Sequence, residues 1–126
     1  MSKIVIADSS CLIALSKIGE LKLLEQLFSH VFIPQAVYKE VVIRGEGRPG
    51  SKEVSSAAWI KVQNISDKLA VDALRLQLGL GESEAIVLTV ELKADFIILD
   101  DWRARQAAVE PKAAGHWHNG NINQGC

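Results

Sequence analysis

Two short apolar runs that end in aspartate constrain the fold of this chain more than any other feature. The first is Lys3–Ala7, which is followed by Asp8, and the second is Ala94–Leu99, which is followed by Asp100 and Asp101. Such runs are typical of strands buried on both faces of a parallel sheet. Open α/β proteins place their ligands at the carboxyl ends of these strands. Two strands that deliver acids to one crevice therefore indicate a divalent-metal site.

Length and composition allow one ordinary domain. The chain has 126 residues, 48% of them hydrophobic, which is enough for a buried core. Its formal net charge of −1 argues neither for nor against nucleic-acid binding. Cys11 and Cys126 give no disulfide framework, which favours a reducing cytoplasm. No apolar stretch reaches the roughly 18 residues of a membrane span, and Asp8 interrupts the first run too early for a signal peptide. We expect a cytoplasmic protein without membrane association.

Predicted strands and helices alternate along the chain. Strands are expected at residues 3–7, 30–33, 59–62 and 96–99. Helices are expected at residues 9–17, 21–28, from 34 onward, 66–79, 81–93 and 101–109. Strands separated by helices imply right-handed crossovers. We therefore predict a three-layer α/β/α domain with a central parallel sheet of about four strands.

Local signals refine three of these helices. Ser9 or Ser10 is expected to cap the first helix, and Pro34 is expected to occupy the first turn of the third. The helix that follows Ser66 and Asp67 should turn one set of apolar residues inward: Leu69, Ala73, Leu76 and Leu80.

Further acids lie in the predicted helices. Glu40 lies two turns into the helix that begins at residue 34, and Glu82 and Glu84 lie in the first turn of the next-to-last helix. With the strand-end aspartates, they come from four separate elements. Mg²⁺ prefers oxygen ligands and keeps several waters, so a few convergent carboxylates suit it. These carboxylates repel one another, and a bound dication makes their clustering tolerable. Such a site can activate water for attack on a phosphate.

Four segments, taken in order, resemble the PIN-domain superfamily. They are Ile4–Ser10, Ile33–Val41, Gly79–Ile86 and Leu99–Arg105. Within the superfamily they look most like the small prokaryotic toxin-type nucleases of the virulence-associated protein C kind. No single motif is specific, but four in register are. The resemblance implies a PIN-like nuclease domain over residues 1–109 and an atypical polar tail over residues 110–126.

The resemblance implies a metal-dependent ribonuclease that hydrolyses RNA phosphodiesters with Mg²⁺ or Mn²⁺. By this resemblance, the metal-binding or catalytic acids are Asp8, Glu40, Glu84 and Asp100. Two adjacent acids, Glu82 and Asp101, are alternative metal ligands, and Ser10 matches the hydroxyl that orients the first aspartate. Proteins of this group are usually encoded beside a small antitoxin that blocks the cleft, and many form dimers. The implied partners are RNA, a cognate antitoxin and a second copy of the chain.

Each acid also has a simpler explanation when it is taken alone. Asp8 can cap the helix that follows it, and Glu40 can be a solvated helix residue. Glu82 and Glu84 favour a helix N-terminus through its dipole, and Asp101 can pair with the arginine four residues later. The four acids in family order favour a nuclease site over these explanations.

The tail departs from the family pattern. After Val109 the family returns for a last strand with a Val-Thr-Gly-Thr-like start, whereas this tail is polar and lacks strand periodicity. Read one nucleotide later, codons compatible with the tail can encode Val-Thr-Gly-Thr-Met-Gly-Ile-Leu-Ile-Lys. We interpret the tail as the product of a frameshift near residues 109–111, so that His116 and His118 form no metal site. Loss of an edge strand leaves apolar surface uncovered. The alternative function is therefore a catalytically impaired PIN-like module that only binds a partner.

Two other doubly wound families fit the acids less well. A haloacid-dehalogenase-like phosphatase places a second aspartate two residues after the first, where this chain has Ser10. A response-receiver domain needs a phospho-accepting aspartate at the end of a mid-chain strand, and no predicted strand between Ile33 and Phe96 ends in an aspartate.

Overall fold

Four short apolar segments form one parallel sheet. They are β1 (Ile4–Ala7), β2 (His30–Pro34), β3 (Ile60–Gln63) and β4 (Phe96–Ile98). The strand order is β3-β2-β1-β4, and each neighbouring pair is parallel. The structure is a computed structural model that describes residues 3–99. The predicted parallel sheet of about four strands is confirmed.

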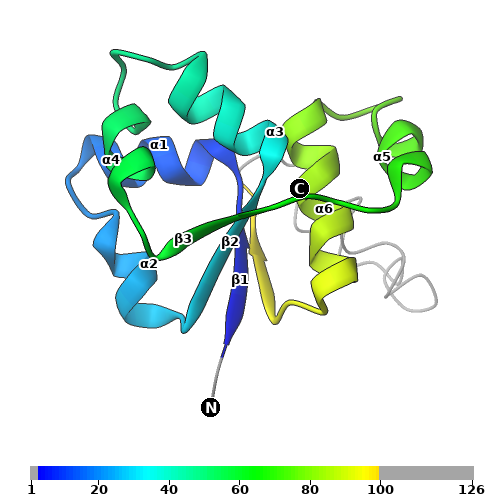
Figure 1. Cartoon of the computed structure of the whole chain (residues 1–126), viewed down its shortest axis with the longest axis horizontal. Helices are drawn as coiled ribbons and strands as arrows, with labels where there is room; N and C mark the ends of the chain where they lie inside the picture. The colour runs from blue at the N-terminus through cyan, green and yellow to red at the C-terminus, as the bar shows by residue number, and fades with distance from the viewer. Residues whose placement is uncertain (1–2, 100–126) are drawn as a thin grey trace, which may run out of the picture.

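Helices cover both faces of the sheet. On one side lie α1 (Ser9–Lys17), α2 (Lys22–Leu27) and α4 (Ser51–Ser56), and on the other lie α5 (Lys68–Leu74) and α6 (Leu80–Leu92) (Figure 1). The short helix α3 (Gln35–Tyr38) runs directly into η1 (Lys39–Ile43), a π-helical turn. The arrangement is the predicted three-layer α/β/α fold. No helix within residues 3–99 is long and apolar enough to cross a bilayer.

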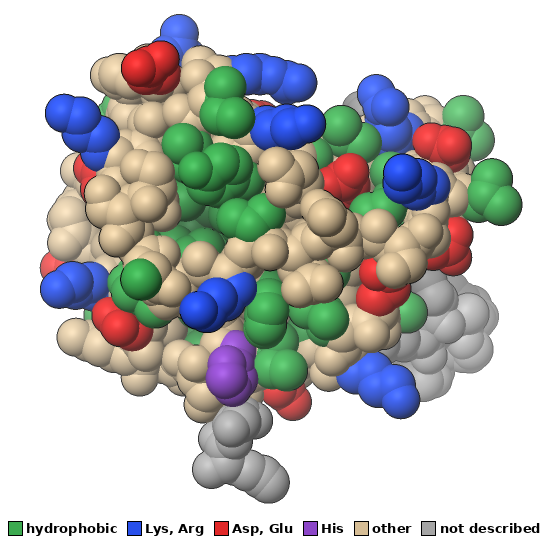
Figure 2. All heavy atoms as spheres, viewed as in Figure 1, with side chains coloured by type: hydrophobic (Ala, Val, Ile, Leu, Met, Phe, Trp, Pro, Cys, Tyr) green, Lys and Arg blue, Asp and Glu red, His purple; other side chains and the backbone are tan. Residues whose placement is uncertain are grey.

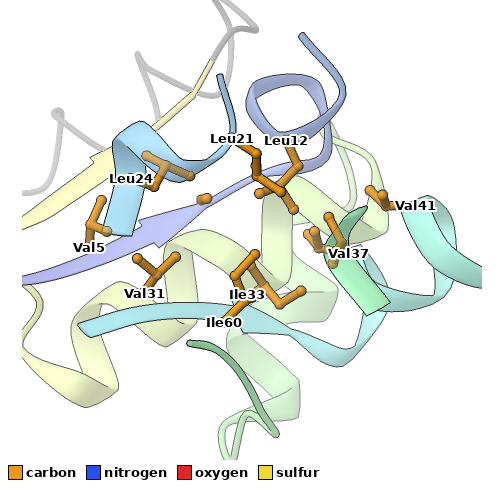
Figure 3. Close-up of a cluster of buried hydrophobic side chains, with 11 residues drawn as sticks. Val5, Leu12, Leu21, Leu24, Val31, Ile33, Val37, Val41 and Ile60 are labelled. Atoms are coloured by element: carbon orange, nitrogen blue, oxygen red, sulfur yellow. The ribbon is translucent and has the colours of Figure 1, made fainter. Parts of the chain in front are cut away.

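The central strand β1 is buried on both faces. Val5 and Ala7 belong to a core beneath α1, α2 and η1, whereas Ile6 packs with Ala85 and Leu88 of α6 on the other face. Side chains alternate across a strand, so a run without polar residues fills two cores at once. Figure 3 shows the first of these cores, where side chains from strands and helices point toward one another. This double burial fixes where β1 ends and thus where Asp8 stands.

The cap of α1 differs from the prediction. Asp8, not Ser9 or Ser10, is the N-cap, and its Oδ1 accepts a hydrogen bond from the backbone N–H of Cys11 at 3.0 Å. The reason is that Asp8 still has extended backbone angles, whereas Ser9 is already helical. Pro34 likewise ends β2 and precedes α3 instead of occupying its first turn.

The predicted inward face of α5 is wrong. Leu69 is 82% exposed and Leu76 is 86% exposed, whereas Val71 is only 4% exposed. Because α5 ends at Leu74, the later residues of the expected stripe do not belong to this helix. Leu80 instead begins α6, and the apolar contact between the two segments is made by other residues.

Candidate active site

A pocket of about 250 Å³ opens at the carboxyl edge of the sheet. Its walls come from residues 8–10 at the start of α1, from α3 and η1 between residues 36 and 44, and from residues 79–82 at the start of α6. The chain enters the first two segments directly from the ends of β1 and β2. Parallel strands end at one edge, so side chains far apart in sequence meet there. Three acids line this pocket: Asp8, Glu40 and Glu82.

Asp8 is delivered by β1 and held by α1. Its side chain is 2% exposed, and the hydrogen bond from Cys11 N–H fixes the orientation of its carboxylate. The simpler explanation of this residue as a helix cap is therefore correct. The same carboxylate lines the pocket, so capping and ligand binding are compatible roles.

Glu40 is held in place by a hydroxyl. The Oγ of Ser9 donates a hydrogen bond to Glu40 Oε1 at 2.6 Å, and Ser9 itself is only 9% exposed. Gly81 approaches the same oxygen from α6, because a Cβ at this position would stand 3.1 Å from Glu40 Oε1. The carboxylate is thus confined between the starts of two helices.

The two glutamates of α6 have different surroundings. Glu82 lines the pocket, and its Oε1 accepts a hydrogen bond from the backbone N–H of Gly79 at 3.0 Å, so it also caps its own helix. Glu84 accepts from the backbone N–H of Ala36 at 3.1 Å and ties α6 to the first turn of α3. Ala36 lines the pocket, so the Glu84 carboxylate lies just behind its wall.

The remaining predicted residues are placed as follows. Ser10 is exposed and lines the pocket, but the hydroxyl that binds one of the acids belongs to its neighbour Ser9. Asp100 and Asp101 lie outside the described residues. The structure therefore brings together the first aspartate, Glu40 and Glu82, and it places Glu84 beside them.

The pocket suits a hydrated hard cation. Within residues 3–99, no three His, Cys, Asp or Glu side chains are close enough to hold a metal ion by themselves. Mg²⁺ is ordinarily held by one or two carboxylates together with waters and substrate phosphates. Asp8 and Glu40, two carboxylates on separate elements of one pocket, supply that kind of donor set.

Two basic residues of the pocket could not be recognised from the sequence alone. Lys39 and Arg44 both line it, one on each side of Glu40 in sequence. Figure 2 shows Lys and Arg side chains gathered over the α3–η1 part of the face in view. The net charge of −1 conceals this local concentration, and the spacing of the two residues is informative only once η1 is known to be a π-helical turn.

The fold and the acidic pocket define an α/β protein with a candidate active site at the carboxyl edge of its sheet. A protein-family model described as a PIN domain matches residues 4–113. The chain therefore belongs to the PIN-domain family, as the four sequence segments indicated. PIN domains are generally nucleases, they typically use divalent metals, and they bind nucleic acid. Searches of curated proteins and of solved structures found no match.

Proposed function

We propose that this protein is a ribonuclease that depends on Mg²⁺ or Mn²⁺ and hydrolyses phosphodiester bonds of RNA. The observation that carries the proposal is the convergence of Asp8, Glu40 and Glu82 from three separate elements on one pocket at the carboxyl edge of the sheet. Helix capping explains Asp8 and Glu82 singly, but it does not explain why Glu40 joins them.

The residues of the pocket have distinct proposed roles. Asp8 and Glu40 bind the cation, and Ser9 positions Glu40 through its 2.6 Å hydrogen bond. A bound cation supplies activation of water and neutralises charge that builds up on the phosphate. Glu84 and Asp100 complete the proposed set of acids, with Glu82 and Asp101 as neighbouring ligands. The buried helix cap keeps the Asp8 carboxylate in one orientation before any ligand arrives.

The biological setting is proposed from the toxin-type resemblance. The protein would act in the cytoplasm as the toxin of a toxin–antitoxin pair, with a cognate antitoxin that blocks the pocket and a second copy of the chain as a further partner. Co-expression tests this role, because growth arrest by the chain alone should be relieved by the product of the adjacent gene. Growth that is unaffected by the chain would contradict the toxin assignment.

Replacement of Asp8 by Asn tests the ribonuclease. Asn caps helices about as well as Asp, so we expect Asp8→Asn to abolish RNA cleavage and to leave thermal unfolding nearly unchanged. EDTA should abolish cleavage by the unaltered chain, and Mg²⁺ or Mn²⁺ should restore it.

Asp67 provides a matched control. It caps α5 in the same way, with its Oδ1 accepting from Ala70 N–H at 3.0 Å, and it does not line the pocket. Asp67→Asn should cleave RNA like the unaltered chain. Equal activity of Asp8→Asn, or activity that survives EDTA, would refute the proposed site.

The second candidate function is a catalytically impaired PIN-like module that only binds a partner. The polar composition of residues 110–126 favours it. The same assay separates the two functions, because an impaired module would cleave no RNA at any metal concentration.

A further inference from the structure

The basic residues of the pocket stand on a single turn of the chain. Lys39 and Arg44 line the same pocket as the acids, and both are exposed to solvent. Glu40, which lies between them in sequence, takes its hydrogen bond from Ser9. The pocket therefore combines three acids with two accessible cations.

The π-helical geometry of η1 explains how two residues five positions apart reach one pocket. In a regular α-helix, such residues point about 140° away from each other. In η1 the backbone N–H of Arg44 donates to the carbonyl of Lys39 at 2.8 Å, so the two residues are separated by one complete turn. A π-type turn therefore aligns them on one side of the helix, and such turns are frequent at functional sites.

Neighbouring elements hold this wide turn in place. The Oγ of the buried Ser51 donates to the carbonyl of Val42 at 2.8 Å. A side chain at Gly45 would approach the carbonyl oxygen of Val41 to 2.5 Å, so the chain can close over the end of the turn only with glycine there. Val41 is itself 1% exposed and anchors the turn in the core. The alignment of the two cations is thus built into the packing of the domain.

We propose that Lys39 and Arg44 bind two phosphate groups of the RNA backbone and thereby position the strand over the acids. This inference rests on the proposed ribonuclease function and adds its substrate-binding residues. Lysine binds phosphate as a point charge, and arginine binds it through a planar fork of donors. Contacts of this kind set the register of a strand without reading its sequence.

The salt dependence of binding tests the proposal. A fluorescent single-stranded RNA is titrated with the full chain carrying Asp8→Asn, in EDTA and at several NaCl concentrations, so that no cleavage interferes. Each phosphate contact on a single strand contributes about −0.7 to the slope of log K against log salt. We expect Lys39→Gln and Arg44→Gln to reduce the slope by about 0.7 each and the double variant by about 1.4. At 0.1 M salt the double variant should bind about 25-fold more weakly.

A control variant removes the same charge elsewhere. Lys17 at the far end of α1 and Lys68 at the start of α5 are exposed and do not line the pocket. Lys17→Gln with Lys68→Gln should leave the slope unchanged. An equal change in both double variants would mean that only total charge matters, and it would overturn the proposal.

The proposed phosphate-binding role and the proposed ribonuclease function can fail independently of each other. If Lys39 and Arg44 only offset the charge of the acids, their removal lowers thermal stability but leaves the salt slope intact, and the inference fails even when the unaltered chain cleaves RNA. If the chain cleaves nothing but the slope falls as expected, the ribonuclease proposal fails and the binding role stands.

Discussion

Replacement of Gly81 by Ala probes whether the position of the Glu40 carboxylate controls catalysis. The new Cβ would stand 3.1 Å from Glu40 Oε1, about 0.3 Å short of the 3.4 Å at which ordinary contacts begin. Because Ser9 holds the same oxygen at 2.6 Å, the carboxylate can yield only by stretching or leaving that hydrogen bond. The substitution therefore acts on one acid without changing any charge.

The magnitudes follow from opposing effects. Alanine in place of glycine in a helix stabilises the folded state by up to about 1 kcal/mol, and by less in the first turn. Strain on the hydrogen bond between Ser9 and the exposed Glu40 offsets part of this, so the free energy of unfolding should change by less than about 1 kcal/mol. A misplacement of about 1 Å can cost about 100-fold in rate. A 100-fold loss corresponds to about 2.7 kcal/mol of activation free energy. If this cost grows in proportion to the displacement, about 0.3 Å raises the activation free energy by about 0.8 kcal/mol and lowers kcat roughly fourfold.

The assay is cleavage of a fluorophore–quencher RNA at saturating substrate and Mg²⁺, alongside thermal unfolding. Gly79→Ala is the matched comparison, because its Cβ would stand 2.7 Å from Glu82 Oε1 and would displace that acid instead. We expect Gly79→Ala to lower stability by about 0.5–1 kcal/mol through a poorer helix cap, and to lower kcat by less than Gly81→Ala does, because Glu82 is a neighbouring ligand in the proposed set and Glu40 is a primary one. An unaltered kcat in Gly81→Ala, or an equal loss in both variants, would refute the reasoning about Glu40.

Two further predictions concern stability. Ser51→Ala removes the buried hydrogen bond to the Val42 carbonyl and should lower the free energy of unfolding by about 1 kcal/mol in denaturant titration. Ser55→Ala, which loses only an exposed bond to its own helix, should change it by less than about 0.5 kcal/mol. Leu12→Ala opens a cavity in the core and should cost about 2–5 kcal/mol, whereas Leu27→Ala, at a site 66% exposed, should cost far less. Similar losses within either pair would contradict the packing described above.

The sequence was sufficient to predict the sheet and the position of Asp8 at its edge. A strand buried on both faces reads as an uninterrupted apolar run, so the end of β1 and the place of Asp8 follow from local pattern. Glu40 was named as one of several acids from separate predicted elements and gained weight from its family context, since one glutamate on a helix carries no signal of its own. The convergence of these acids depends on topology that parallel strands impose.

Other features depend on contacts that no local pattern contains. Which of the two serines, Ser9 or Ser10, binds an acid depends on where α1 begins. A shift of one position along a helix turns a side chain by about 100°, so an error of one residue selects the wrong serine. The π-helical turn depends on Ser51 and Gly45, which lie outside it in sequence. The face of α5 was misread because the helix buries Val71 and exposes Leu69, and because it ends at Leu74, before the expected apolar stripe is complete.

The pairing of β1 with β4 has a consequence for biosynthesis. Val5 pairs with Phe96, and the N–H of Ile4 bonds the side chain of Asp95, which lies 91 residues later. At about 5–20 residues per second, the ribosome delivers this partner about 5–18 s after the first strand. During that interval one flank of β1 is open to wrong partners, and non-local pairing is slow even once both strands are free. The yield of native protein should therefore depend on chaperone capacity and on the pace of translation between β1 and β4.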